Sequence, residues 1–482
     1  MIEDSSGKKI PSPLLSLVPL IVLVGLLFFA IRIFGSDALG GASQIVLLAA
    51  TAVCILIAMT CCDIRWKTIE VAIVRNISGV TTALIILLLI GALSGSWMIS
   101  GIIPTLIYYG VKIIHPDYFL VSTCAICAIV SVMTGSSWTT VATIGIALFG
   151  IGRVQGFHEG WIAGAIISGA YFGDKISPLS DTTVLASSIT DTPLFTHIRY
   201  LMVTTIPSIT ITLLIFLIAG FSNKGASLEE INVFTAALSD SFYISGWLLL
   251  VPLMMCVLIV KKSPPIITLF LSVIAAAICA LICQSELLYQ ISGMETHHAT
   301  ATFKGLFIML SSSTQLETGH STLNELVSTR GMAGMLNTIW LIICAMCFGG
   351  AMTAGGMLES ITSVFLRFMK RAVGLVTSTV FTSLFLNTCT ADQYLSIILA
   401  GDMYKQIYKQ KGYESRLLSR TLEDSATVTS PLIPWNTCGM TQSTVLGVST
   451  FVYLPYCFFN LISPLMSIIV AATGYKIIKK SL

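Results

Sequence analysis

The sequence predicts an all-α polytopic membrane protein, and three observations predict it. Of its 482 residues, 55% are hydrophobic and only 10% are charged, whereas ordinary soluble domains carry about 25% charged residues. Long apolar runs recur along the chain, and most are long enough to cross a hydrocarbon layer about 30 Å thick. Polar, helix-breaking clusters interrupt the apolar sequence at four places. We therefore expect roughly 11–13 transmembrane segments, with broken helices or re-entrant hairpins among them.

Individual apolar runs predict individual transmembrane segments. Six of the clearest runs cover residues 14–34, 42–62, 79–98, 201–221, 246–260 and 266–283. The first run is too long for a signal peptide and no small-residue cleavage site follows it, so we expect a retained helix. Most of the 13 cysteines lie inside apolar runs, where cysteine acts as a small hydrophobe. A redox or metal pair at Cys124 and Cys127 is the less favoured alternative, and the sequence calls for no cofactor.

Basic residues predict the orientation of the chain. They cluster before the first run, after the second, in the connection 405–420 and at the C-terminal end; the terminal ones are Lys8, Lys9, Lys476, Lys479 and Lys480. The positive-inside rule places these regions, and so both termini, in the cytoplasm. No basic cluster suggests nucleic acid. The more polar region 286–330 carries His297, His298 and His320; we expect a solvated loop with short re-entrant or interfacial helices, with metal binding as the alternative.

The four polar clusters form two matched pairs. They are "MTGSSWTT" from Met133, "DKISPLSDTT" from Asp174, "LNTCTADQ" from Leu386 and "EDSATVTSPLIPWNT" from Glu423. Thr134 to Ser177 and Asn387 to Ser430 both span 43 positions, and both pairs end in Ser-Pro-Leu. One unit is therefore written twice, at an offset of 253 residues. We expect a single membrane domain, 1–482, made of two repeats, 14–221 and 243–475.

The links inside the two units predict that the repeats are inverted. The first link, "GIGRVQGFHEG", has one arginine, whereas the second is the basic connection assigned to the cytoplasm. Inverted repeats with discontinuous helices are the build of many secondary transporters, with the binding site near the bilayer midplane. In lipid an unpaired backbone group costs several kcal/mol, so the breaks must face protein or a water-filled cavity. The alternative is that proline and polar residues merely kink ordinary helices.

Carboxylates in the breaks are the candidate site residues. We predict a sodium site at Asp174, Asp181, Asp392 and Asp424, because carboxylates at membrane depth are costly and by default functional. Burial disfavours the ionised form, so one carboxyl group can hold either a proton or a cation. Asp181 is expected to begin a half-helix, as N-cap or as site oxygen, with capping alone as the alternative; Lys175 could neutralise Asp174. Neutral oxygens are expected from Ser137, Thr139, Thr140, Asn387, Thr390, Asn436 and Thr437.

The segment "FGDKISPLSDTTVLASS", Phe172 to Ser188, resembles the signature of the NhaC-type sodium/proton antiporter family, whose relatives include sodium-lactate/malate-proton exchangers. "NELVSTRGMAGML", "FGGAMTAGGMLES" and "TSPLIPWNTCG" extend the resemblance over nearly the whole chain. The resemblance implies a secondary transporter of the ion-transporter superfamily in a bacterial cytoplasmic (inner) membrane. Within the matched motifs it implies a site formed by Asp174, Ser177, Asp181, Thr182, Thr183, Asn436 and Thr437.

The sequence therefore predicts a sodium/proton antiporter that exchanges cytoplasmic Na+ for external H+ at a midplane site. The alternative is sodium- or proton-coupled exchange of small organic anions such as malate or lactate, or of amino acids. Helix N-termini at the Ser-Pro-Leu sequences could hold a carboxylate, and Trp138 and Trp435 could wall an organic substrate or serve only as packing. An enzyme is not expected, because Tyr171 replaces the first glycine of the Gly-x-Gly-Asp of intramembrane aspartyl proteases. Repeated breaks favour a carrier with alternating access over a channel. For the oligomeric state, a homodimer is the alternative to a monomer.

Overall fold

The structure is a computed structural model of the chain. It describes residues 2–3, 9–34, 41–222, 228–261, 263–294, 299–316, 318, 323–324, 327–365 and 372–478. Lys8, Lys479 and Lys480, and the three histidines of region 286–330, lie outside these residues. Two short strands, β1 (Ile2–Glu3) and β2 (Lys9–Ile10), pair antiparallel. The rest of the regular structure described is helical, as the composition predicts.

Nine helices in the described residues are long and apolar enough to cross a membrane. They are α1 (Pro13–Phe34), α2 (Ala42–Cys61), α4 (Thr81–Ile99), α6 (Pro116–Thr134), the continuous stretch Ser137–Val154, α11 (Leu194–Ser222), α14 (Pro265–Cys283), the stretch Met332–Ala354 that contains α18 (Leu336–Ala354), and α20 (Ala372–Thr390). Two further spans are bent helix pairs, Ile231–Ser241 with Gly246–Ile259 (89°) and Thr450–Tyr456 with Phe458–Thr473 (55°). The chain is thus an all-helical, multi-pass membrane protein, with up to 11 spans by this measure.

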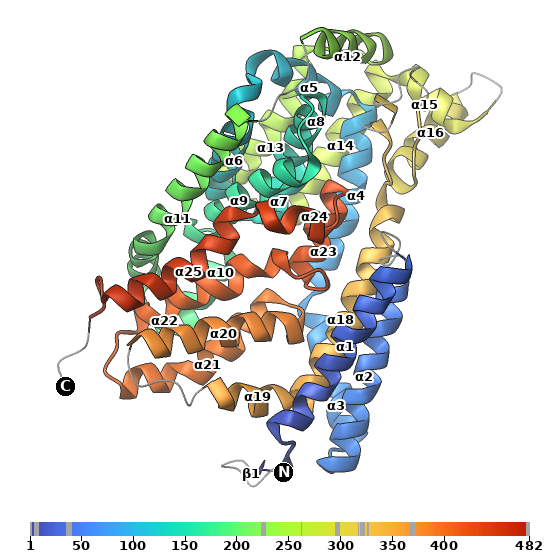
Figure 1. The fold of residues 1–482 in the computed structure, drawn as a ribbon. Coiled ribbons are helices and arrows are strands. Elements are labelled where there is room, and N and C mark those ends of the chain that lie inside the picture. Colours follow the sequence, from blue (N-terminus) through green and yellow to red (C-terminus); the bar gives the residue numbers. More distant parts are fainter. Residues whose placement is uncertain are drawn as a thin grey trace.

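Shorter helices complete the fold (Figure 1). They are α3 (Trp66–Gly79), α5 (Ile102–Ile113), α9 (Glu159–Ile176), α10 (Asp181–Ile189), α12 (Leu228–Ser241), α13 (Leu250–Val260), α15 (Ser285–Ser292), α16 (Ala299–Ser311), α19 (Met357–Phe365), α21 (Gln393–Gln410), α22 (Ser415–Leu422), α23 (Thr437–Leu446), α24 (Thr450–Tyr453) and α25 (Phe458–Thr473). In the view of Figure 1, α12, α15 and α16 lie at the end of the molecule opposite the start of α1. The short helices α15 and α16 occupy the region where the sequence predicts them.

All four polar clusters interrupt helices, as predicted. We call residues 116–189 the first unit and residues 372–446 the second unit. In the first, α6 gives way to α7 (Ser137–Thr140), the π-helical segment η2 (Val141–Gly145) and α8 (Ile146–Val154); after a link, α9 breaks before α10. In the second, α20 breaks before α21, and α22 continues into the π-helical segment η6 (Glu423–Thr427) and the 3-10 turn η7 (Ser430–Leu432) before α23.

The hydrogen bonding at the first break of each unit is the same. Thr134 accepts from the backbone N–H of Ser136 (3.1 Å) and lies 3.2 Å from the hydroxyl of Thr140. In the second unit Thr390 makes the corresponding contacts with Asp392 (3.4 Å) and Ser396 (3.1 Å). These equivalents stand 256 positions apart. The 253-residue offset is therefore wrong by three, because the two Ser-Pro-Leu sequences occupy different places relative to the second break.

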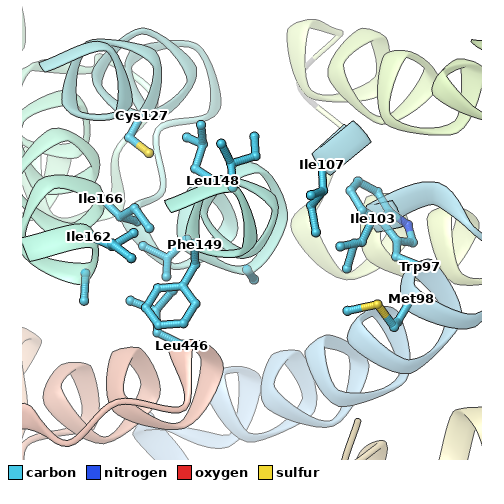
Figure 2. Packing of buried hydrophobic residues seen from close by; sticks show 14 of the residues in the cluster. Trp97, Met98, Ile103, Ile107, Cys127, Leu148, Phe149, Ile162, Ile166 and Leu446 are labelled. Atoms are coloured by element: carbon cyan, nitrogen blue, oxygen red, sulfur yellow. The ribbon is translucent and has the colours of Figure 1, made fainter. Parts of the chain in front are cut away.

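Two glycines allow α6 and α9 to pack with their backbones in contact. A Cβ at Gly169 would lie 2.2 Å from the carbonyl oxygen of Cys124, and one at Gly173 would lie 2.5 Å from that of Ala128. Such small-residue pairs four apart are a common means of close helix packing in membranes. Figure 2 shows Ile162 and Ile166 of α9 in one apolar cluster with Cys127 of α6. Cys124 and Cys127 are free and buried in this packing, so they form no disulfide.

Candidate functional site

A cavity of about 640 Å³ lies at the first breaks of both units. Its walls include the breaks after α6 and α9, the start of α21, the beginnings of α4 and α14 and the connection before α14. Three of the four predicted aspartates line it: Asp174 and Asp181 from the first unit and Asp392 from the second. The fold therefore brings together carboxylates that are more than 200 positions apart in the sequence.

Asp174 lies at the C-terminal end of α9 and faces the N-terminus of the helix that starts at Ser137. One carboxylate oxygen accepts from the backbone N–H (3.0 Å) and the hydroxyl (2.6 Å) of Ser137. The other accepts from the hydroxyl of Ser180 (2.6 Å). Asp174 is only 5% exposed, and its negative charge is stabilised by the positive end of a helix dipole. Its hydrogen bonds leave the group in contact with the cavity, where a cation could approach it.

Asp181 is the first residue of α10, but it is not the N-cap. The cap is Ser180, whose hydroxyl accepts from the backbone N–H of Thr183. Asp181 does begin a half-helix, as expected, but of its two expected functions, N-cap or site oxygen, the N-cap is wrong, because the preceding serine has the extended backbone that a capping side chain needs. Asp181 is exposed and lines the cavity, as does Thr182. Thr183 instead donates to the carbonyl of Lys175 (3.0 Å) and so ties α10 back to the end of α9.

Asp392 caps α21 and connects the first break of the second unit to the start of α23. One carboxylate oxygen accepts from the backbone N–H of Leu395 (3.0 Å) and the other from the hydroxyl of Thr437 (3.1 Å). Thr437 is the first residue of α23 and lies behind the cavity wall. Asp392 is thus both a structural cap and a wall residue of the cavity. These two functions can be separated by substitution.

The remaining predicted oxygens divide between the cavity and the breaks. Thr139 lines the cavity. Ser177 donates to the carbonyl of Val132 (2.8 Å), and Thr140 donates to the carbonyl of Ser136 (2.9 Å). Hydrogen bonds at the breaks of the second unit involve Asn387, Thr390 and Asn436. These side chains satisfy unwound backbone groups, which at membrane depth have no water to pair with.

Asn387 and Asn436 show this function most clearly. Asn387 donates to the carbonyl of Ala426 (2.6 Å), and Asn436 donates to the carbonyl of Asn387 (3.1 Å). Asn436 also caps α23. The two amides therefore join the two breaks of the second unit to each other, and neither lines the cavity. Trp138 does line the cavity, whereas the indole N–H of Trp435 donates to the carbonyl of Thr388 (2.8 Å).

Asp424, the fourth predicted aspartate, lies apart from the cavity in a fully buried charged cluster. It forms an ion pair with Lys175, and it accepts a hydrogen bond from Thr204 (2.9 Å). The guanidinium of Arg420 lies 3.6 Å from its second oxygen, and the hydroxyl of Ser463 also reaches it (3.3 Å). The four aspartates thus do not form one site, because Asp424 pairs with the buried lysine in the protein interior and does not line the cavity.

Sequence reasoning missed most of this charged cluster. Thr204 and Ser463 lie on α11 and α25, far from the broken segments, and nothing in the sequence marks them. Arg420 did carry a signal, because it precedes Asp424 by four residues and so faces it on the same side of a helix. Ser180, the residue that both caps α10 and binds Asp174, also carried one, since serine is a preferred N-cap.

The comparisons place the chain among known transporters. Residues 169–475 match the model of the "Na+/H+ antiporter family". The chain is 36% identical to the Na(+)/H(+) antiporter NhaC of Alkalihalophilus pseudofirmus, over 88% of this chain and 89% of that protein. It is 37% identical to the malate-2H(+)/Na(+)-lactate antiporter of Bacillus subtilis, over 85% of each. It is also 32% identical to the arginine/ornithine antiporter ArcD of Halobacterium salinarum, over 99% of this chain and 95% of that protein.

Proposed function

The chain belongs to the Na+/H+ antiporter family, and on this premise we propose that it exchanges cytoplasmic Na+ for external H+ at the cavity between its two units. The observation that carries the proposal is the convergence of Asp174, Asp181 and Asp392 on one cavity. Carboxylate and hydroxyl oxygens are ligands that small hard cations prefer. A carboxyl group at membrane depth binds either a proton or a cation, and this competition is the simplest chemistry for exchange.

The orientation of the cavity supports an inward-facing state. Its walls include the α3–α4 junction and the connection before α14. Arg75 and Lys261 are exposed beside these two segments, and the positive-inside rule assigns such a face to the cytoplasm. The same rule supports cytoplasmic N- and C-termini and, given the bacterial relatives, a place in the cytoplasmic (inner) membrane.

A second cavity supports alternating access. It has a volume of about 240 Å³ and is lined by Phe149, Arg153 and Glu159, among others. The larger cavity contacts Trp138 and Thr139, at the other end of the helix that runs from Ser137 to Val154. Two cavities at opposite ends of one spanning helix are what a carrier needs if it opens to one side at a time.

We further propose that the chain is built from two inverted repeats, 14–221 and 243–475. The order of helices and breaks in α6–α10 recurs in α20–α23, and the hydrogen bonds at the first break recur with it. The stretch 150–160 around the α8–α9 link has one arginine, Arg153, whereas the stretch 405–420 around the α21–α22 link has five basic residues. Opposite placement of these two links across the membrane would make the repeats inverted.

The test uses purified protein in liposomes with a trapped pH-sensitive dye and an imposed proton gradient. Addition of external NaCl should dissipate the gradient, and addition of choline chloride should not. The gradient must also stay intact in liposomes without protein. If sodium has no effect on the gradient in the presence of the protein, sodium/proton exchange is the wrong function.

Exchange of a small organic anion is the second candidate, because the cavity is far larger than a sodium ion requires. A volume of about 640 Å³ lies in the range of pockets for small organic ligands, and Trp138 in the wall offers an apolar surface. Two relatives are named for organic substrates, malate and lactate in one and arginine and ornithine in the other. The liposome assay decides between the candidates when malate, lactate or amino acids are added: proton movement that requires one of them favours the organic exchanger.

A further inference from the structure

We propose that Glu423 carries the proton in the exchange, while the carboxylates of the cavity bind the sodium ion. This inference rests on the proposed sodium/proton exchange. It assigns the two ions to two separate sites, one that opens to water and one that is enclosed. Glu423 is the first residue of η6 and precedes Asp424.

The surroundings of Glu423 favour a carboxyl group that carries its own proton. The side chain is fully buried, and neither carboxyl oxygen makes a hydrogen bond of regular geometry among the described residues; the hydroxyl of Thr427, four residues on, is a donor that acts on it. An ionised carboxylate in such a place lacks water and is poorly supplied with donors, which costs several kcal/mol. The neutral acid avoids this cost. A buried acid with no ion pair of its own is therefore suited to gain and lose a proton as its electrostatic surroundings change.

Asp424 is a poorer proton carrier than its neighbour. Its charge is balanced by Lys175 and stabilised by the hydroxyl of Thr204 (2.9 Å). A proton on Asp424 would leave the lysine as an uncompensated buried charge, and such a charge is strongly unfavourable. Protonation of Glu423, unlike that of Asp424, thus breaks no ion pair seen in the described structure.

Charges near Glu423 can couple its proton to a sodium ion in the cavity. The charges that act on it are those of Asp174, Lys175 and Asp424. Other titratable groups on the elements packed against η6 are Asp181 of α10, Cys389 of α20, Tyr394, Asp402, Tyr404, Lys405, Tyr408 and Lys409 of α21, and Arg416 and Arg420 of α22; α25 contributes none. A negative Asp174 attracts a proton to Glu423, and a sodium ion bound at Asp174 cancels that attraction. Sodium binding and proton binding therefore oppose each other, as exchange requires.

The experiment compares two transport modes of Glu423→Gln in liposomes. Sodium counterflow, measured with 22Na+ moving against unlabelled Na+, needs no proton and should continue. Sodium-driven proton movement, measured with the trapped dye, should be lost. The matched control is Glu359→Gln, since Glu359 is exposed on α19; it should keep both modes. Proton movement at the wild-type rate in Glu423→Gln would overturn the assignment, and so would loss of both modes in a variant that elutes as a folded protein.

A second variant serves if Glu423→Gln does not fold. Glu423→Asp retains an acid, and aspartic acid is slightly stronger than glutamic acid. Its proton movement should therefore reach half of the maximum at a lower pH than in the wild type; an unchanged pH profile would count against Glu423. Absence of both counterflow and proton movement in the wild-type protein would instead refute the proposed function itself.

Discussion

Lys175 and Asp424 form an ion pair whose two side chains are fully buried and which joins α9 of the first unit to η6 of the second. Asp174, the preceding residue, faces the cavity instead. The end of α9 thus presents one charged side chain to the cavity and the next to the protein interior. A change of charge at Asp174 therefore lies next to a contact that holds the two units together.

Loss of one partner should destabilise the protein more than loss of both. Lys175→Met leaves the Asp424 carboxylate buried with less compensation, which should cost about 3–5 kcal/mol. The double variant Lys175→Met/Asp424→Leu removes both charges and should recover much of that loss. Unfolding in detergent, followed by intrinsic fluorescence, measures both. A single variant as stable as the wild type would show that the ion pair contributes little to the fold.

Neutralisation of the cavity aspartates should abolish transport without loss of the protein from the membrane. We expect Asp174→Asn or Asp181→Asn to abolish sodium-dependent proton movement, because each removes a negative charge from the cavity. The control is Asp402→Asn, since Asp402 is exposed on α21 and does not line the cavity. Full exchange in both cavity variants would mean that these carboxylates are structural.

Substitution of Asp392 separates its two functions. Serine is a good N-cap, so Asp392→Ser should keep α21 folded while it removes the charge. We expect normal expression and elution but a sodium concentration for half-maximal exchange that is at least about tenfold higher, about 1.4 kcal/mol. An unchanged sodium dependence in Asp392→Ser would leave capping as the only function of the aspartate.

Ser180→Ala should affect both stability and sodium binding. The substitution removes the cap of α10, which typically costs about 0.5–2 kcal/mol. It also removes the 2.6 Å hydrogen bond to Asp174, so the carboxylate should lose its fixed position. Thermal unfolding and the sodium dependence of proton movement report the two effects separately. Ser188→Ala, in the same helix and exposed, is the control; equal behaviour of the two variants would contradict the assigned function of Ser180.

The contact between α6 and α9 should tolerate no larger side chain. Gly169→Leu places carbon atoms where the carbonyl oxygen of Cys124 lies, and we expect the variant to aggregate when extracted in detergent. Gly25→Leu is the control, since nothing lies within 4 Å of a Cβ at that position. Size-exclusion profiles of the two variants give the comparison. A monodisperse profile for Gly169→Leu would mean that the two helices can move apart.

The sequence was sufficient to predict the helical spans, the four breaks and the position of Asp174 at one of them, because hydropathy and polar interruptions are local properties. It could not predict that Lys175 reaches Asp424, a partner 249 positions away, since such a contact depends on how the two units pack. The capping of α10 by Ser180 could have been predicted, because serine is a preferred N-cap. The neighbouring carboxylate of Asp181 was chosen instead, since aspartate is also a preferred N-cap. The offset between the units was misjudged because the two Ser-Pro-Leu sequences are identical but occupy different positions in their units. The first follows the end of α9, and the second forms the 3-10 turn η7.

The glycines at the contact of α6 and α9 also limit which parts of the carrier can move. The backbones of α6 and α9 contact each other at Gly169 and Gly173, so we expect the two helices to move as one body. We expect the hinges at the breaks that line the cavity, where hydroxyl side chains bond to backbone carbonyl groups outside the regular helical pattern. If the transported ion binds at those breaks, as proposed, it binds at the hinges themselves. Its binding and release would then change the hinge conformation directly, without a conformational change that has to be passed on through the rigid helices.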